Sequence, residues 1–248
     1  MFMKIAVLTR ENSLLSSAEQ LASRLHLPCV SEKNAVYDAY LVLTSDYLGL
    51  ETKDKQEKSL AVDFLSGAMR YRLKSSGKKQ LLAKAVGLNK YASLRILDAT
   101  PGLGHDAFVL SYLGGEVECV ERSPIVGALL ADAIARAKKA GQLTEQSLRL
   151  IIEDAKEFLQ RTTVSYDVIY LDPMFPDRTK SALNKKAMRV LAALVGNDGD
   201  ADALLNIALE KAVKRVVVKR PRLAPALKGP SPTYTIKGTS LRFDIYLI

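Results

Sequence analysis

The sequence predicts an α/β protein whose main domain is a doubly wound, mostly parallel sheet. From about residue 91 onward, short apolar runs alternate with segments of helical periodicity, which is the pattern of βαβ units. The apolar runs contain almost no polar residues, as buried parallel strands require. Two further strands at the C-terminus predict a closing antiparallel pair.

Residues 1–90 precede this pattern and predict a small N-terminal α+β extension. Its apolar residues change from strand spacing to helical spacing and back within a short length. The predicted elements are, in order, a strand at Lys4–Leu8, a helix at Ser13–Leu25, a hairpin of Tyr40–Leu43 and Tyr47–Leu50, a polar turn or boundary at Glu51–Lys58, and a strand around Leu60–Phe64.

Residues 91–248 form the predicted main domain. Its strands are expected at Arg95–Asp98, Val117–Glu121, Leu148–Ile152, Asp167–Leu171 and Val213–Lys219, with the closing pair at Thr233–Ile236 and Leu241–Ile248. Helices are expected at His105–Leu113, Ser123–Ala140, Asp154–Gln160, Leu183–Val195 and Ala201–Ala212. In a sheet of this kind, ligands bind beyond the carboxyl ends of the strands.

The composition narrows the class of protein. The chain has 248 residues, 48% of them hydrophobic, which suits one sizeable core with a small appendage. Its net charge of +9 favours a polyanionic partner, most commonly a nucleic acid. Cys29 and Cys119 are too few for a disulfide framework or a zinc site, and their apolar neighbours predict buried thiols. Without a visible targeting signal or membrane-length apolar run, we expect a cytoplasmic protein with no membrane or metal partner.

A glycine-rich loop follows the first strand of the main domain. Gly102–Ala107 matches G-x-G-x-x-A, with Gly102 and Gly104 placed so that a ligand can approach backbone N–H groups at a helix N-terminus. Glu121, at the end of the next strand, stands where an acid binds a ribose. The pattern alone suits a dinucleotide or S-adenosylmethionine. Asp98 at the strand end and Pro101 in the loop favour S-adenosylmethionine, because a carboxylate suits a cationic cofactor and proline offers no N–H to a phosphate.

Two acids near this loop have both a functional and a structural interpretation. Asp154-Ala155, after the third strand, is placed to cap the adenine end of the cofactor, and Asp154 also suits the N-cap of the following helix. Asp106 is either a cofactor contact or a first-turn acid that complements the helix dipole.

The fourth strand ends on Asp172-Pro173-Met174-Phe175-Pro176, which suggests chemistry on a nucleobase amine. A carboxylate at Asp172 and the backbone carbonyl of Pro173 can accept both hydrogens of an exocyclic amino group, and Phe175 can stack on the ring. The stretch resembles the [Asp/Asn/Ser]-Pro-Pro-aromatic motif of amino-group methyltransferases, with Met174 in place of the second Pro. The structural alternative is an ordinary strand-end turn.

Together these stretches resemble the bacterial small-subunit ribosomal RNA guanine-N2 methyltransferase J family. The resemblance runs from about Asp63 to the C-terminus. The stretches that carry it are Leu97–Leu110, Glu121–Pro124, Tyr170–Pro176, Lys180–Leu183 and Val217–Pro221.

This resemblance implies a class I methyltransferase with a Rossmann-like sheet that uses S-adenosylmethionine to methylate a guanine of 16S ribosomal RNA, free or within the small subunit. It implies cofactor contacts at His105-Asp106, Glu121-Arg122, the Asp154 region and Asp172. His105 stands where we expect Arg in many relatives. The implied chemistry is direct methyl transfer, in which Asp172 and Pro173 orient the amine and Phe175 stacks on the extruded base.

Basic residues near the predicted active edge are candidates for RNA contacts, namely Lys180, Lys219, Arg220 and Arg222. A second basic cluster spans Arg70–Lys79. The alternative for both groups is a solvated surface. At the level of function, the alternatives are an adenine-N6 methyltransferase on DNA or RNA, an NAD(P)-linked oxidoreductase and a non-catalytic RNA-binding protein. The sequence predicts no oligomeric state.

Overall fold

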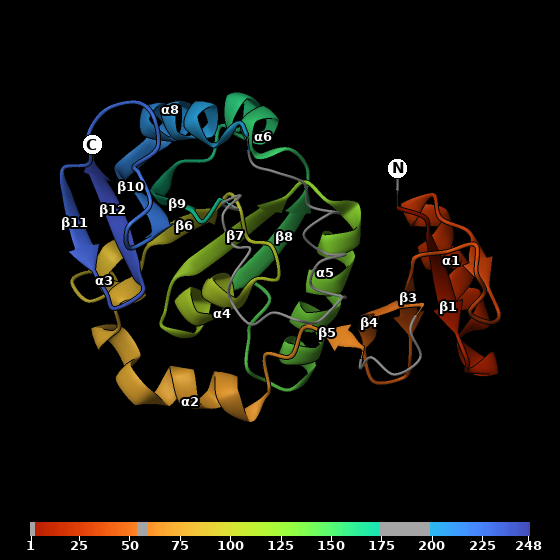
Figure 1. The fold of residues 1–248 in the computed structure, drawn as a ribbon. Helices are drawn as coiled ribbons and strands as arrows, with labels where there is room; N and C mark the ends of the chain where they lie inside the picture. The colour runs from red at the N-terminus through yellow and green to blue at the C-terminus, as the bar shows by residue number, and fades with distance from the viewer. Residues whose placement is uncertain (1–2, 54–58, 174–198) are drawn as a thin grey trace.

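Two β-sheets lie side by side in the computed structural model, which describes residues 3–53, 59–173 and 199–248 (Figure 1). The first part of the chain forms the small sheet, and the rest forms the large one. Several sequence predictions lie outside the described residues: the helix at 183–195, the stacking role of Phe175, the RNA contact of Lys180 and residues 54–58 of the predicted polar turn.

The small sheet has the strand order β2-β1-β3-β4-β5, and the predicted hairpin is confirmed as the antiparallel pair β3–β4. Strand β2 pairs with β1 in parallel and was not predicted, because it has only two residues. Cys29 in this strand is exposed, so the prediction of two buried thiols is wrong for Cys29, whereas Cys119 is buried. The elements are β1 (Ile5–Thr9), the 3-10 helix η1 (Asn12–Leu14), α1 (Leu15–Leu25), β2 (Cys29–Val30), β3 (Ala39–Leu43), β4 (Leu48–Thr52) and β5 (Leu60–Ala61).

The large sheet confirms the predicted doubly wound architecture. Its order is β11-β12-β10-β9-β6-β7-β8, with parallel pairing from β8 to β10 and antiparallel pairing of β12 with both β10 and β11. The chain order reverses between β6 and β9, which is the switch point where such folds bind ligands. The strands are β6 (Arg95–Asp98), β7 (Glu116–Glu121), β8 (Leu148–Ile152), β9 (Tyr166–Leu171), β10 (Ala212–Pro221), β11 (Tyr234–Lys237) and β12 (Leu241–Leu247).

Helices cover both faces of the large sheet (Figure 1). Helices α2 to α5 pack against one face, and α6 and α8 pack against the other. The helices are α2 (Gly67–Ser76), the 3-10 helix η2 (Gly77–Lys79), α3 (Leu81–Val86), α4 (His105–Tyr112), α5 (Pro124–Lys139), α6 (Ala155–Arg161) and α8 (Ala201–Lys211).

Strand alternation divides the core between these two faces. In β9, Val168 and Tyr170 are buried under α4 and α5, whereas Ile169 and Leu171 are buried with α6 and α8. A strand that is buried on both faces needs apolar residues at successive positions, which explains why its sequence is nearly all apolar.

The boundary at residue 90 stays a prediction, but residues before it already pack on the large sheet. Helix α3 contacts β10 and β12, and the Phe64 ring stacks on Phe108 of α4 with 4.4 Å between centroids. Within residues 3–53, 59–173 and 199–248, no helix has the length and apolar character to cross a membrane, and no cluster of three or more acidic, His or Cys side chains is arranged to hold a metal ion.

Candidate active site

The ends of β6 and β9 are tied together at the switch point. The Ala99 N–H donates to the Tyr170 carbonyl at 3.0 Å, and the Asp172 N–H donates to the Thr100 hydroxyl oxygen at 2.6 Å. These bonds place Asp98, the last residue of β6, and Asp172, the residue after β9, at one edge of the sheet.

A cavity of about 350 Å³ opens at this edge, and the ends of several strands contribute to its wall. Its lining includes the loop after β6, the start of α4, the end of β7, the start of α6, the end of β9, the start of α8 and a lysine of β10. The lining residues that carry charge are Arg72, Asp98, Asp106, Glu121, Arg122, Asp154, Lys156, Asp172, Asp200 and Lys219.

The Glu121 side chain holds the glycine-rich loop, residues 102–107, in place by hydrogen bonds. Its carboxylate accepts the Gly102 N–H at 3.1 Å and the Ser123 N–H at 2.8 Å. Gly102 and Gly104 both have positive φ, of 52° and 72°, which favours glycine. At Gly104 a Cβ atom would also meet the Leu130 side chain at 2.4 Å, so the loop can lie this close to α5 only without a side chain.

Lys219 forms the centre of an ion-pair cluster in the cavity. Its Nζ atom lies 2.7 Å from Asp106 and 2.8 Å from Asp172. The parallel pairing of Val218 with Leu171 brings Lys219 level with Asp172 across the two strands. Arg72 of α2 also pairs with Asp106 at 2.5 Å, and the Tyr170 hydroxyl donates to the same carboxylate at 2.8 Å.

The buried acids Asp98 and Asp106 have opposite pKa shifts. Burial raises the pKa of Asp98 well above its ordinary value, and the nearby charges of Asp106 and Asp172 add to this, whereas the Thr100 N–H opposes it. Burial would also raise the pKa of Asp106, but the positive charges of Lys219 and Arg72 outweigh burial and hold that pKa well below its ordinary value. The cavity therefore contains one carboxyl whose ionisation is well compensated and another whose ionisation is costly.

At the other end of the cavity, Asp154 is confirmed as the N-cap of α6. Its carboxylate accepts the N–H groups of Lys156 and Glu157 at 2.8 and 3.4 Å. Asp200, just before α8, pairs with Lys156 at 2.5 Å and with Arg122 at 3.6 Å. These pairs link the beginnings of α6 and α8 to the end of β7 around the cavity.

Comparison with known proteins identifies the family. The family described as "Putative SAM-dependent methyltransferase" matches residues 20–248. The chain is 48% identical over 236 residues to ribosomal RNA small subunit methyltransferase J of Coxiella burnetii, with 94% of this chain and 93% of that protein covered. It is 45% identical to the protein of the same name from Cellvibrio japonicus, with 93% and 92% covered.

This chain belongs to the ribosomal RNA small subunit methyltransferase J family. A crystal structure of an S-adenosylmethionine-dependent methyltransferase from Neisseria gonorrhoeae matches it with a TM-score of 0.76 at 33% identity, covering 98% of this chain and 95% of that one. The chain is therefore a class I methyltransferase, and S-adenosylmethionine is its cofactor. Membership in the methyltransferase J family decides against the NAD(P)-linked oxidoreductase and the non-catalytic RNA-binding protein.

The chemistry of the cavity fits this cofactor. Fully buried Asp98 offers a carboxyl whose ionised form a cationic ligand would stabilise, which suits the charged aminoacyl end. Glu121 ends β7 and lines the cavity, as a ribose-binding acid does, and a carboxylate is a suitable acceptor for the hydroxyl groups of a diol. Asp154 and Ala155 line the opposite part of the wall, where the adenine end would lie.

Most of the residues that the sequence predicts for the active site of a methyltransferase J enzyme line this cavity. They are Asp98, Gly102, His105, Asp106, Glu121, Arg122, Asp154, Ala155, Asp172 and Pro173. Gly104 lies beneath them against α5, and the ring of His105 stands edge-on to Phe64 at 6.1 Å. Their roles in binding and catalysis stay predictions.

Two of the predicted RNA contacts need correction. Lys219 points into the cavity, and its side chain is 19% exposed. Arg220 is buried, and its guanidinium donates to the Pro225 carbonyl at 2.6 Å. Neither side chain is placed on an outer rim, whereas Arg222 is exposed. The correction has a physical reason: alternate residues of β10 point to opposite faces of a sheet that is covered on both sides.

Several lining residues were missed by sequence reasoning. Tyr170 lies within an apolar run and has the pattern of a core residue, yet its hydroxyl reaches Asp106. Arg72 belongs to a helix without clear apolar periodicity. Lys156 lies in the first turn of α6 and Asp200 directly before α8, and the sequence predicted both helices without a role for these two side chains. The charge on Arg72 was noted in a basic cluster, but only the fold shows that it turns inward.

Proposed function

We propose that this enzyme transfers a methyl group from S-adenosylmethionine to the exocyclic N2 amine of a guanine in 16S ribosomal RNA. The observation that carries the proposal is the position of Asp172-Pro173. It lies at the end of β9, in the same cavity as the strand-end acids Asp98 and Glu121. Family membership supports ribosomal RNA as the substrate, because the relatives are named as small-subunit ribosomal RNA methyltransferases.

Asp172 is suited to orient a poor nucleophile. The lone pair of the guanine N2 amine is delocalised into the ring. The rate of methyl transfer therefore depends on holding the amine in the orientation that points its nitrogen at the methyl group. The Asp172 carboxylate and the Pro173 carbonyl would accept its two N–H bonds. S-adenosylmethionine, when bound, supplies an electrophilic methyl group. As the new N–C bond forms, the bond between the methyl carbon and the sulfonium sulfur would break, leaving a neutral thioether. The amine would then lose one proton, which the Asp172 carboxylate or water would accept.

Lys219 supports this role of Asp172. Its ammonium group at 2.8 Å favours the ionised carboxylate, which is the stronger acceptor of N–H bonds. The Thr100 hydroxyl oxygen, which accepts the Asp172 N–H, fixes the backbone at the same residue. Side chain and backbone of Asp172 are thus both held before the substrate binds.

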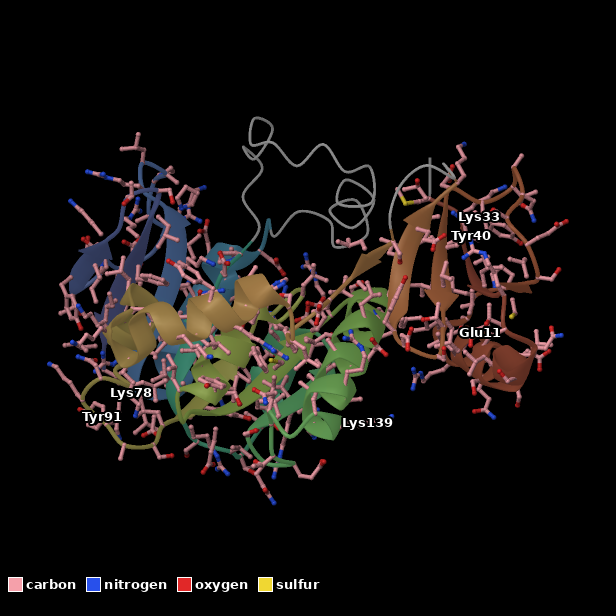
Figure 2. All side chains as sticks on the ribbon, turned by 90° about the horizontal axis from the view of Figure 1, so that it is seen from below. Glu11, Lys33, Tyr40, Lys78, Tyr91 and Lys139 are labelled. Carbon is pink, nitrogen blue, oxygen red and sulfur yellow. The ribbon has the colours of Figure 1, made fainter. Side chains whose placement is uncertain are left out.

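The RNA is expected to reach the cavity along a basic surface formed by α2, η2 and Arg222. Arg70, Lys74, Lys78 and Lys79 are exposed on α2 and η2, and no acidic residue lies among residues 67–79. Figure 2 shows α2 lying across the front of the larger unit, with Lys78 near its end. Through Arg72, the same helix touches the cavity at Asp106. The proposal places the enzyme in the cytoplasm, where small subunits are assembled.

Substitution of Asp172 tests the proposed chemistry. Asp172→Ala and Asp172→Asn should lower methyl transfer into ribosomal RNA by at least about a hundredfold, because a single preorganised hydrogen-bonding group that acts in the transition state typically contributes that factor. Transfer should be measured at saturating S-adenosylmethionine, with occupancy of the cofactor checked by calorimetry. The exposed residue Asp46 provides a control, and Asp46→Asn should behave as wild type. Activity of the Asp172 variants within a few-fold of wild type at equal occupancy would disprove the role.

A further inference from the structure

The loop formed by the last residue of β10 and the four residues after it, 221–225, is bound by the side chain of buried Arg242. The Arg242 Nη1 atom donates to the backbone carbonyls of Pro221, Arg222 and Ala224 at 3.2, 2.9 and 2.6 Å. The other side of the same guanidinium donates to the Asp244 carboxylate at 2.8 and 3.0 Å. One buried ion pair therefore binds three backbone carbonyls of this short loop.

A second buried arginine holds the far end of the loop. Arg220 donates from Nε and Nη2 to the Pro225 carbonyl, at 3.1 and 2.6 Å. Backbone bonds add to this, since the Ala224 N–H donates to the Pro221 carbonyl at 3.1 Å. Burying a guanidinium is costly unless its donors are satisfied. Two such groups directed at one short loop indicate that the shape of the loop is functionally important.

Leu223, at the tip of this loop, has a solvent-exposed aliphatic side chain. Leu223 is 94% exposed, more than any other large hydrophobic residue among the described residues, and its neighbour Arg222 is exposed as well. A single exposed leucine is ordinary on a protein surface. An exposed leucine on a loop fixed by two buried arginines is different, because rigidity keeps it from folding back onto the protein.

The loop follows closely on the residue that pairs with the proposed catalytic acid. It begins just after Lys219, whose Nζ atom is 2.8 Å from Asp172. Since a chain extends at most about 3.6 Å per residue, the Cα atom of Leu223 lies within about 14 Å of that of Lys219. Beyond the loop, the Lys228 N–H donates to Asp202 of α8 at 2.9 Å, and the start of α8 also lines the cavity.

We propose that Leu223 is an apolar wedge that enters the base stack of ribosomal RNA next to the nucleotide to be methylated. The proposal rests on the proposed function and names a residue that acts on the RNA at that site. A base inside a stack cannot reach a cavity at a strand end, so it must be extruded. Apolar side chains such as leucine separate stacked bases in other nucleic-acid complexes, and a neighbouring arginine can hold the phosphate.

Rigidity is what allows a single leucine to act as a wedge. A flexible tip would yield when pressed against stacked bases, whereas a tip fixed by guanidinium bonds keeps its position. The side chain contributes no charge, so its effect lies in the separation of bases rather than in the electrostatic attraction of RNA. Loss of the wedge should therefore lower kcat and leave the affinity for RNA and its salt dependence almost unchanged.

The test compares Leu223→Ser with Leu223→Phe. We expect Leu223→Ser to lower the kcat of methyl transfer into 16S ribosomal RNA by about tenfold, with unchanged cofactor binding and unchanged melting temperature, because the side chain touches little of the protein. Leu223→Phe should restore most of the rate, since an aromatic ring also separates bases. Val213→Ser, at the other end of β10 and 51% exposed, is the matched control and should behave as wild type.

Three results would overturn the wedge. The first is wild-type kcat in Leu223→Ser. The second is a loss confined to RNA affinity, which would make Leu223 a contact without a role in extrusion. The third is a loss seen with assembled small subunits while naked ribosomal RNA is methylated normally, which would place a ribosomal protein against the loop. Failure of the proposed function is distinguishable from these, because the wild-type enzyme itself would then transfer no methyl group to the RNA.

Discussion

Asp98 and Asp106 differ mainly in their partners. Both lie in the cavity near Lys219, but only Asp106 receives the ion pairs of Lys219 and Arg72 and the Tyr170 hydroxyl. Asp98 is fully buried and accepts the Thr100 N–H. Ionisation of Asp98 therefore costs stability in the folded protein, and we propose that the positively charged end of the cofactor reduces this cost when it binds.

Replacement of Asp98 should have opposite effects on the stability of the ligand-free protein and on its affinity for the cofactor. The pKa of Asp98 is raised in the folded state, so the folded protein loses stability as pH rises above the ordinary aspartate value of about 4 towards the raised pKa. Asp98→Asn removes this penalty and should raise the melting temperature of the ligand-free protein, by more at pH 8 than at pH 5. A change of 1 kcal/mol corresponds to about 2–4 °C for a chain of this size. Cofactor affinity should fall in the same variant.

Thermal melts at the two pH values, together with calorimetry, check this pair of effects. An Asp98→Asn variant that melts lower than wild type at pH 8 would mean that the carboxylate stabilises the ligand-free fold. Unchanged cofactor affinity would remove Asp98 from the binding site.

Glu121 should contribute to cofactor affinity through its charge. Glu121→Gln keeps the size of the side chain but replaces a charged acceptor by a neutral one. Loss of a hydrogen bond to a charged group typically costs about 1.5–3 kcal/mol, so affinity for S-adenosylmethionine should fall by roughly tenfold or more. Calorimetry measures this, with Glu157→Gln on the exposed side of α6 as the control. Equal affinity in the Glu121 variant would show that the ribose is bound elsewhere.

At the scale of elements, strands were easier to predict than the helices between the two sheets. Strands β6, β7, β9 and β10 are largely buried, so their apolar runs stand out. Helix α2 was missed because, among residues 67–74, only Met69 and Leu73 are buried, too few to give a helical period. The directions of Lys219 and Arg220 depend on the alternation of β10 and on Arg242 and Asp244 of β12, and neighbours so distant in sequence cannot be seen from the charge pattern.

Helix α2 and η2 should provide much of the electrostatic attraction to RNA. Neutralising Arg70, Lys74 and Lys78 by glutamine should weaken binding to 16S ribosomal RNA and make it less sensitive to salt. The log–log slope should become shallower by roughly 0.7–0.9 for each phosphate contact that is lost. Binding measured across a salt series gives this slope.

A matched triple variant on the small sheet controls for the change in net charge. Lys4, Arg24 and Lys53 are exposed residues of the N-terminal extension. Their replacement by glutamine should leave the slope close to that of wild type. Equal salt-dependence slopes in the two triple variants would mean that the charges on α2 and η2 affect RNA binding only through the net charge of the protein.

At the scale of the whole molecule, the small sheet and the large sheet share a continuous apolar core. One buried cluster includes Ile5 and Leu41 of the small sheet as well as Phe108 and Val168 of the larger unit. The doubly wound architecture and the position of the cavity at the strand ends could be predicted from the alternating pattern. The way residues 62–90 pack against the large sheet could not, because that packing depends on contacts such as Phe64 on Phe108.

The central claim is that the cavity methylates the N2 amine of a guanine in 16S ribosomal RNA. The most direct test incubates wild-type enzyme and Asp172→Asn with methyl-labelled S-adenosylmethionine and ribosomal RNA or small subunits that lack the modification. The labelled nucleoside is then identified by mass spectrometry. The account predicts N2-methylguanosine at one position of 16S ribosomal RNA with wild-type enzyme, and at most a trace with Asp172→Asn. Label on an adenine N6 atom, or equal label from both proteins, would contradict it.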